Sequence, residues 1–399
     1  GHDKLFFYNH IIMATSAIQA RYGTIKSPPN KYAKWTSLTN MSMKELEKMV
    51  GRKPTPQDIM IAGMLKKETL LDMLKNFVLY EVEEHKKVKK VAKHQQYRVV
   101  TKAVKRISSQ KDVKNKGGVV WHTQGSGKSL SMVWFATQLY YKFGRPTIMI
   151  ITDRRQLNKQ IFDTFRNCGF PEPAKPRNRS QLSKILQHAK GKTIMVNLQK
   201  FDKPEKFVET KEKIYVLVDE AHRSQYKWTA GYMRKAMPNA VFFAFTGTPL
   251  NKNKKNTYRE FGPLIDKYSF VESKEDGATV KVEHTGLLPE LEIEGGNSLN
   301  DVFKNLFGHL PKAQQAEIRR KYATKKKIAS SPARIREICK TIVKHYTGKI
   351  LPNGYKAMIV APTRAAAVTY KRELEDLTKL PSRIIMDSKK DEVGPDGFS

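Results

Sequence analysis

The stretch GGVVWHTQGSGKSLSMVW, residues 117–134, decides the fold of this protein. It begins with a short β-branched run, passes through the small residues Gly125, Ser126 and Gly127, and ends in a segment of helical character. A strand that enters a helix through such a turn presents backbone N–H groups to phosphate. The stretch therefore predicts a phosphate-binding loop, although His122 stands where the usual G-x-x-x-x-G-K-[ST] pattern has its first glycine.

Short apolar runs recur on either side of longer, polar segments of helical character between Gly117 and Thr248. The runs are β-branched or aromatic and continuous, as is typical of parallel strands covered on both faces. Strand and helix in alternation predict a doubly wound α/β domain. The runs are residues 117–121, 147–152, 193–197, 214–219 and 241–246.

A second motif, IYVLVDEAH, supplies the carboxylates that a nucleotide site needs. Asp219 ends an apolar strand, where it can meet a Mg²⁺ ion held at the phosphate loop, and Glu220 can polarise the attacking water. In the loop itself, Lys128 would reach the β- and γ-phosphates and the Ser129 hydroxyl would bind Mg²⁺. An acid after a strand is also a common helix cap, but here it follows a phosphate loop two strands later.

A third motif, FTGTPL, ends another predicted strand. A turn built from glycine and proline is one interpretation of it. Behind the Asp-Glu-Ala-His sequence, Thr246 and Thr248 also offer hydroxyls that could sense His222 and relay the state of the nucleotide.

The composition narrows the class of protein. The chain has 399 residues with a formal net charge of +36, which favours a polyanionic partner, nucleic acid rather than membrane. No apolar run approaches the roughly 18 residues that a membrane span needs. Cys168 and Cys339 are too few for a disulfide framework or a zinc cluster, which fits the cytoplasm. We expect His85, His94 and His122 to be packed or solvent-facing rather than metal ligands.

The segment before the loop reads as mostly helical up to Lys111, with an irregular connector at residues 23–35. Apolar residues at helical spacing predict a core-facing helix there. The basic block at residues 86–116 is either a solvated helix face or part of a DNA path. The apolar residues are Leu70, Met73, Leu74, Phe77 and Val78.

The region after Pro249 is less regular. It contains a basic helical stretch, AQQAEIRRKYATKKK, and then a predicted buried strand at residues 355–363. A helix should follow from about Arg364 to Thr378, with a possible strand RIIMD after it. This order resembles the opening of a second α/β domain.

The ordered set QGSGKS, ITDR, DEAH and TGTP resembles that of superfamily 2 helicases and translocases, which are built on paired RecA-like domains. The wording of GGVVWHTQGSGKSLSMVW, LVDEAHRSQY, AFTGTPL and KAMIVAPTRAAAVTYKREL is more specific. It resembles the motor (R) subunit of type I restriction enzymes, as do ITDRRQLNKQI, NLQKF, ARYGTI and FGPLIDKY. The match covers most of Leu5–Leu377.

The resemblance implies roles for individual residues. Gln96, or Gln95 beside it, would read the adenine of ATP, and residues Thr123, Gly125, Ser126, Gly127, Lys128 and Ser129 would bind the nucleotide. Asp219, Glu220 and Lys128 would be catalytic, with Ser129 and Asp219 on Mg²⁺. The resemblance implies that Thr152, Asp153 and Arg154 touch the DNA backbone. It also implies that His222, Thr246 and Thr248 couple ATP hydrolysis to movement.

The resemblance also implies a domain layout. We expect the tail of a nuclease domain and a helical linker at 1–85, a RecA-like motor domain at 86–260, a connecting region at 261–330 and the start of a second RecA-like domain at 331–399. The family's nuclease centre and the arginine fingers of its second domain are expected outside this chain. Its partners would be double-stranded DNA and the methylation (M) and specificity (S) subunits.

The leading hypothesis is therefore an ATP-driven translocase on double-stranded DNA, the motor of a type I restriction complex. A strand-separating superfamily 2 helicase acting on DNA or RNA is an alternative. A non-catalytic nucleic-acid-binding module with a vestigial nucleotide fold is a second alternative, although the intact Lys128, Asp219 and Glu220 argue against it.

Overall fold

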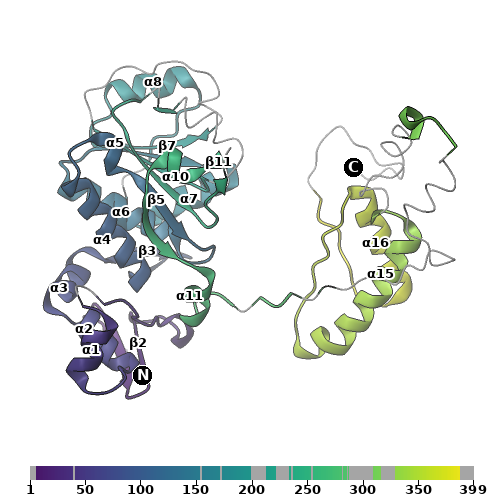
Figure 1. Ribbon diagram of the computed structural model, residues 1–399, viewed down its shortest axis with the longest axis horizontal. Coiled ribbons are helices and arrows are strands. Elements are labelled where there is room, and N and C mark those ends of the chain that lie inside the picture. Colours follow the sequence, from purple (N-terminus) through teal and green to yellow (C-terminus); the bar gives the residue numbers. More distant parts are fainter. Residues whose placement is uncertain are drawn as a thin grey trace. The chain divides into compact units, whose positions relative to one another are not determined.

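The computed structural model divides the chain into two compact units, Gly1–Val282 and Glu283–Ser399 (Figure 1). None of the described helices has the length and apolarity needed to cross a membrane. The structure describes residues 6–38, 41–152, 155–170, 173–198, 213–221, 233–234, 237–252, 255–280, 282–284, 286, 309–315 and 329–386.

A six-stranded sheet organises the first unit, and all of its strands are parallel. Its order is β12-β5-β9-β8-β6-β7. The predicted RecA-like α/β fold is thus confirmed, and the five predicted strands lie within a residue of their expected bounds. The strands are β5 Gly118–His122, β6 Thr147–Thr152, β7 Thr193–Asn197, β8 Ile214–Asp219, β9 Val241–Thr246 and β12 Leu264–Tyr268.

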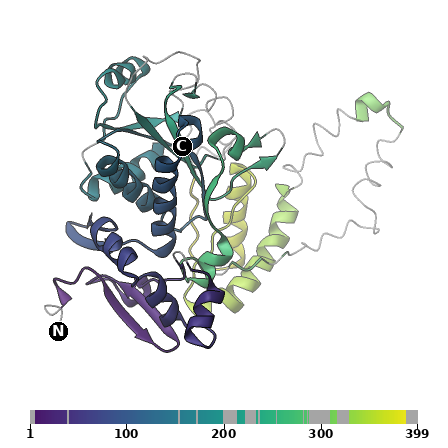
Figure 2. The same cartoon turned by 60° about the vertical axis from the view of Figure 1, so that its left-hand side comes forward.

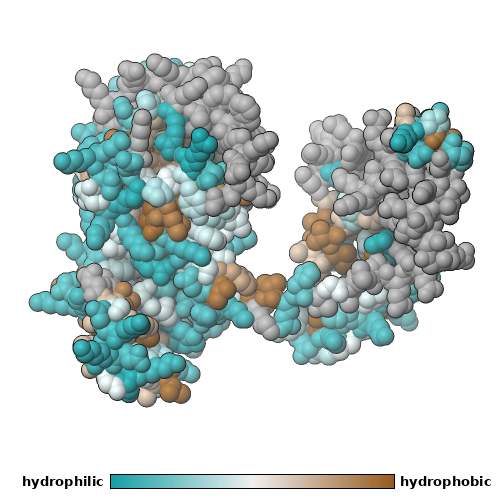
Figure 3. Space-filling view, viewed as in Figure 1, coloured by the Kyte–Doolittle hydropathy of each residue, from teal (hydrophilic) through white to brown (hydrophobic). Residues whose placement is uncertain are grey.

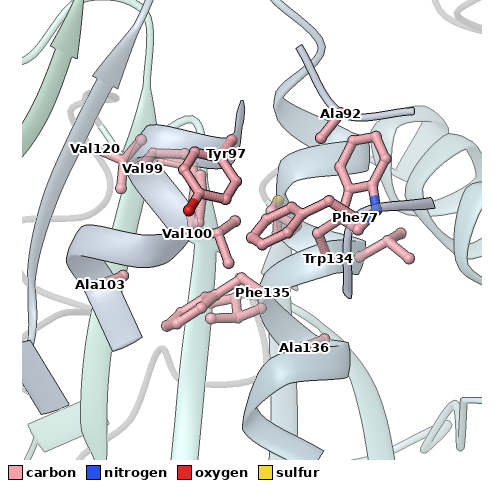
Figure 4. Close-up of a cluster of buried hydrophobic side chains, with 14 of the residues drawn as sticks. Phe77, Ala92, Tyr97, Val99, Val100, Ala103, Val120, Trp134, Phe135 and Ala136 are labelled. Carbon is pink, nitrogen blue, oxygen red and sulfur yellow. The ribbon is translucent and has the colours of Figure 1, made fainter. Parts of the chain in front are cut away.

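Helices cover both faces of this sheet, as the continuous apolar strands predict. Alternate residues of β6 enter opposite cores: Ile148 and Ile150 join one, Met149 and Ile151 the other. The first core includes α4, α6 and α7, and Figure 4 shows Val120 of β5 within it. The helices are α4 His94–Ser109, α5 Val113–Lys116, α6 Lys128–Lys142, α7 Arg155–Asn167, α8 Arg179–Gln187, α10 Thr257–Phe261 and α11 Phe270–Glu275.

The N-terminal part is not mostly helical, and that prediction is wrong. It holds two antiparallel hairpins besides its helices, and Figure 2 shows the purple β1–β2 pair. The β3–β4 turn uses Glu84 and His85 at positive φ (45° and 65°), a conformation that glycine or asparagine normally signals. The elements are β1 Ile12–Ser16, β2 Gln19–Gly23, a 3-10 turn Pro29–Lys31, α1 Met43–Val50, α2 Pro56–Gly63, α3 Lys67–Asn76, β3 Val78–Glu83 and β4 Lys86–Val91.

Two expected boundaries shift in the first unit. The helix expected through Val78 ends at Asn76, and Val78 begins β3 instead. The sheet also extends past residue 260, because β12 pairs with β5 and supplies its edge strand. The small pair β10 Asn251–Lys252 and β11 Lys255–Asn256 lies between β9 and α10.

The second unit contains a helix pair with a small core, Ile335, Cys339, Ala366 and Tyr370. The predicted helix after residue 363 is confirmed as α16, with Thr363 as its cap. Most of the predicted basic helical stretch lies outside the described residues. The elements are α15 Pro332–His345, a π-helical turn Tyr346–Ile350, a 3-10 turn Leu351–Asn353 and α16 Arg364–Leu377.

The predicted strand at residues 355–363 is wrong for this structure. The segment has no regular secondary structure, and Met358 and Val360 are 86% and 87% exposed. The same holds for residues 383–386 of RIIMD, where Ile385 is 93% exposed; Asp387 lies outside the described residues. Among the described residues no strand pairs with either segment. Figure 3 shows hydrophobic surface on this unit.

Candidate nucleotide site

The phosphate loop joins β5 to α6 and turns where the sequence predicts. Gly125 and Gly127 have φ of 83° and 86°, a left-handed region that residues with a Cβ rarely adopt. A Cβ on Gly127 would also lie 2.5 Å from Gln96 Nε2. Between the glycines, Ser126 Oγ donates to the carbonyl of Thr123 at 2.7 Å, and Thr123 N donates to Tyr268 O at 3.0 Å. The loop is therefore held in one conformation from within and from β12.

Two buried glutamines of α4 hold the loop from outside. Gln95 Nε2 donates to Ser126 O at 3.3 Å, and Gln96 Nε2 donates to Gly127 O at 3.0 Å. Gln96 Oε1 meanwhile accepts from Lys93 N at 2.8 Å. Both ends of the Gln96 amide are thus bonded to the backbone. Its expected contact with adenine stays a prediction.

Lys128 begins α6 and lies between the loop and the carboxylates. Its Nζ donates to the carbonyl of His122 at 3.4 Å and is 3.9 Å from Glu220 Oε1. Ser129 follows it in the first turn of α6. The lysine side chain is 10% exposed, so its charge is poorly hydrated and close to an opposite charge.

The two adjacent acids lie at the carboxyl end of β8. Asp219 is the last residue of that strand and is 7% exposed. Glu220 has a φ of 52°, rare for a residue with a side chain, and its N–H donates to Phe245 O at 2.9 Å. The strand therefore ends in a bend at the position of the two carboxylates.

The TGTP turn packs against the phosphate loop. Thr246 ends β9 opposite Trp121, whose Nε1 donates to Gly247 O at 3.1 Å. A Cβ on Gly247 would lie 3.3 Å from Gln124 N, so only glycine fits without a shift. Thr248 N donates to Thr246 Oγ1 at 3.2 Å.

The expected DNA and coupling residues are only partly within the described chain. Thr152 is buried at the end of β6, the neighbour of β8. Asp153, Arg154 and His222 lie outside the described residues. Their roles stay predictions.

The donor set suits a nucleotide with Mg²⁺. Phosphate needs cationic and N–H donors, which Lys128 and the glycine turn provide. Magnesium prefers oxygen ligands and takes one or two carboxylates together with substrate phosphates. Ser129 and Asp219 are oxygen donors of that kind, at the loop and at the end of β8.

A buried acid beneath the loop escaped the sequence analysis. Asp266 of β12 accepts from His122 Nε2 at 2.9 Å, Arg98 Nε at 2.9 Å and Lys102 Nζ at 2.7 Å. Burial alone would raise the pKa of Asp266, but these donors lower it to about 2. Burial lowers the pKa of His122, so its imidazole is neutral and Nε2–H donates. His122 is fully buried, as one of the expected alternatives has it.

A second acid repeats this arrangement nearby. Asp276 Oδ2 lies 2.6 Å from His94 Nε2 and accepts from the Tyr268 hydroxyl at 2.8 Å. A cavity of about 630 Å³ lies beside His94 and Arg98. The residues that line it come mainly from β2, α2, α4, α11 and residues 34–36, and not from the phosphate loop.

Comparison with known proteins identifies relatives of the chain. Residues 95–316, more than half of it, match the SWI2/SNF2 ATPase family. The HindI type I restriction enzyme endonuclease subunit of Haemophilus influenzae is 30% identical over 92% of the chain. A candidate subunit of the same kind from Methanocaldococcus jannaschii, MjaIXP, is 26% identical over 99%.

The chain spans 36% of the length of the first of these relatives and 40% of the second. The family match includes α4, the phosphate loop, the two acids and β12. The chain therefore belongs to the SWI2/SNF2 ATPase family, and over most of its length it is similar to the endonuclease subunits of type I restriction enzymes.

Proposed function

We propose that this chain is the motor part of a type I restriction endonuclease subunit and that it hydrolyses ATP to move along double-stranded DNA. One observation carries the proposal. The adjacent strands β5, β9 and β8 bring the phosphate loop, the TGTP turn and the two acids to the same edge of the sheet. The carboxyl edge of parallel strands is where such folds bind nucleotides.

The proposed chemistry is in-line attack of water on the γ-phosphorus. Glu220 would orient the water and accept its proton while the bond from the γ-phosphorus to the β–γ bridging oxygen breaks. Lys128, which is 3.9 Å from Glu220, would turn towards the phosphates when the nucleotide binds. The Ser129 hydroxyl and Asp219 would hold Mg²⁺, whose charge neutralises the phosphates when it is bound.

The contact of the TGTP turn with the loop supports a coupling role. Gly247 lies so close to the loop that a Cβ added to it would meet Gln124 N at 3.3 Å, and Trp121 Nε1 donates to the carbonyl of Gly247. We propose that Thr246, Thr248 and His222 transmit the nucleotide state, and that Thr152, Asp153 and Arg154 contact the DNA backbone. The net charge of +36 favours that partner. The M and S subunits would supply target recognition.

The test compares Lys128→Ala and Glu220→Gln with wild type in the full-length subunit, assembled with its M and S subunits. Lys128→Ala should weaken nucleotide binding and abolish DNA-stimulated hydrolysis. Glu220→Gln should keep binding and lose hydrolysis by a factor of about 10² or more. Both variants should lose translocation along DNA, measured as displacement of a triplex-forming strand. Lys105→Ala, a substitution at an exposed residue of α4, should retain it.

Three outcomes would count against the proposal. Unchanged hydrolysis in Lys128→Ala would remove the assigned site. Robust unwinding of a forked duplex by wild type would favour a helicase instead. Nucleotide binding without any hydrolysis would favour a vestigial module.

A further inference from the structure

Asp266 accepts hydrogen bonds from three side chains that lie on two other elements of the first unit. Its side chain is 1% exposed, and Arg98 Nε reaches both oxygens, at 2.9 Å and 3.1 Å. Lys102 and His122 add one bond each. One carboxylate thus joins β12, on which it lies, to helix α4 and to strand β5.

Two of the three donors, His122 and Arg98, lie next to groups that hold the phosphate loop. His122 is the last residue of β5, and its carbonyl accepts from Lys128 Nζ. Arg98 lies one turn or less beyond Gln95 and Gln96, which hold the two carbonyls of the glycine turn. A shift of β5 or of α4 away from Asp266 would therefore move the phosphate loop.

This geometry explains why a histidine, His122, can occupy the usual glycine position. A glycine at residue 122 would leave Asp266 without a donor from β5, and would leave a space where the imidazole packs against the Tyr268 ring, 5.7 Å away between centroids. The bend of the loop does not need glycine there, since its left-handed residues are Gly125 and Gly127.

We propose that Asp266 is a positioning residue of the nucleotide site, acting through His122 on β5 and through Arg98 and Lys102 on α4. The inference rests on the proposed nucleotide function. In this role Asp266 sets the distance between the phosphate loop and the two glutamines that hold it, Gln95 and Gln96, and does not contact the nucleotide. Loss of the carboxylate charge should therefore impair ATP binding more than the chemical step.

The experiment measures the Kd of a fluorescent ATP analogue and the kcat and KM for ATP, in the full-length subunit with its M and S subunits. Asp266→Asn should raise Kd and KM about tenfold, the effect of losing one charge-assisted bond in a preorganised site. The kcat at saturating ATP should change less than about threefold, because Lys128, Asp219 and Glu220 are intact.

Arg106→Gln is the matched control. Arg106 Nε donates to Gly117 O at 2.8 Å and so joins the same helix to the opposite end of the same strand segment. It should lower the melting temperature without changing Kd. If Asp266→Asn lowers the melting temperature and leaves Kd unchanged, Asp266 has only a structural role and the inference is wrong.

A milder variant keeps the test decisive should Asp266→Asn fail to fold. The side chain of Lys102 is 51% exposed, so Lys102→Gln removes one hydrogen bond to Asp266 without creating a cavity in the core. It should raise Kd two- to fivefold with kcat unchanged, and an unchanged Kd would overturn the inference. Failure of wild type to bind the analogue would instead refute the proposed function.

Discussion

The same type of apolar run has different outcomes in the two units. TIMIIT, residues 147–152, is strand β6, and all six of its residues are buried. KAMIVA, residues 356–361, resembles it in composition and also precedes a helix, yet Met358 and Val360 are 86% and 87% exposed. Both runs are predicted to be strands, so the surroundings of each run must contribute to the difference.

Pairing explains it. Strand β6 has β8 on one side and β7 on the other, and helices on both faces. In the described part of the second unit, the run has α15 and α16 nearby but no strand beside it. Strand propensity reflects fit to a paired and half-buried surface more than an intrinsic backbone preference. The comparison teaches that such a run encodes a strand only together with its neighbours.

Truncation of one large residue in each unit tests this contrast most strongly. Phe243 of β9 is fully buried, and the centroid of its ring is 4.7 Å from the centroid of the Phe135 ring. Phe243→Ala should lower the free energy of unfolding of the first unit by about 3–5 kcal/mol in urea titrations. Ile385→Ala, at an exposed apolar residue of the second unit, should change the free energy of unfolding of that unit by less than about 0.5 kcal/mol. Equal losses would contradict the contrast.

The helix pair of the second unit offers a smaller effect. Ile335 is fully buried between α15 and α16, so Ile335→Ala should cost about 2–5 kcal/mol there. Amide hydrogen exchange should show faster exchange in α15 and α16 and unchanged exchange in β5 to β9. Val368→Ala, at a 36% exposed position of α16, serves as the control. Faster exchange in both units would show that they unfold together.

The pH dependence of stability reports on the polar core of the first unit, around His122. Burial lowers the pKa of His122, so the unfolded chain takes up a proton below the ordinary value of 6.5 that the native state does not bind. Wild type should thus lose stability as the pH falls through 6.5. Asp266, Arg98 and Lys128 are the charged groups that influence this histidine.

His122→Gln should be less stable than wild type by about 1–3 kcal/mol at pH 7.5. The gap should narrow towards pH 5.5, because glutamine has no such proton to bind. Val120→Ala, at a buried apolar residue of the same strand, is the control, because it changes no titratable group and its difference from wild type should stay constant. Thermal unfolding at a series of pH values measures both, and a gap of constant size for His122→Gln would contradict the prediction.

Much of the first unit could be predicted because its signals are local. Strands buried on both faces are short and continuously apolar, and the glycines of the loop mark its bend. Strand β12 was missed because Asp266 and Lys267 interrupt its apolar pattern, as suits an edge strand. The β3–β4 hairpin was missed because its turn contains neither glycine nor asparagine.

The support of the site could not be predicted for another reason. His122 and Asp266 are 144 residues apart in the sequence and meet only because β12 pairs with β5. Likewise, Gln95 and Gln96 could be located as a motif, but their bonds to the loop carbonyls depend on how α4 packs. Contacts of this kind follow from the assembled sheet, whereas sequence patterns report only which residues favour a strand or a turn.

The backbone at Glu220 has a consequence for the evolution of this site. A residue with a side chain in the left-handed region costs roughly 1 kcal/mol relative to glycine. Selection for stability alone would therefore replace Glu220 with glycine, and the same replacement would remove the carboxylate that lies beside Lys128. If Glu220 orients the attacking water as we propose, a glutamate at this position is a local trade-off in which the protein gives up some stability to keep that carboxylate.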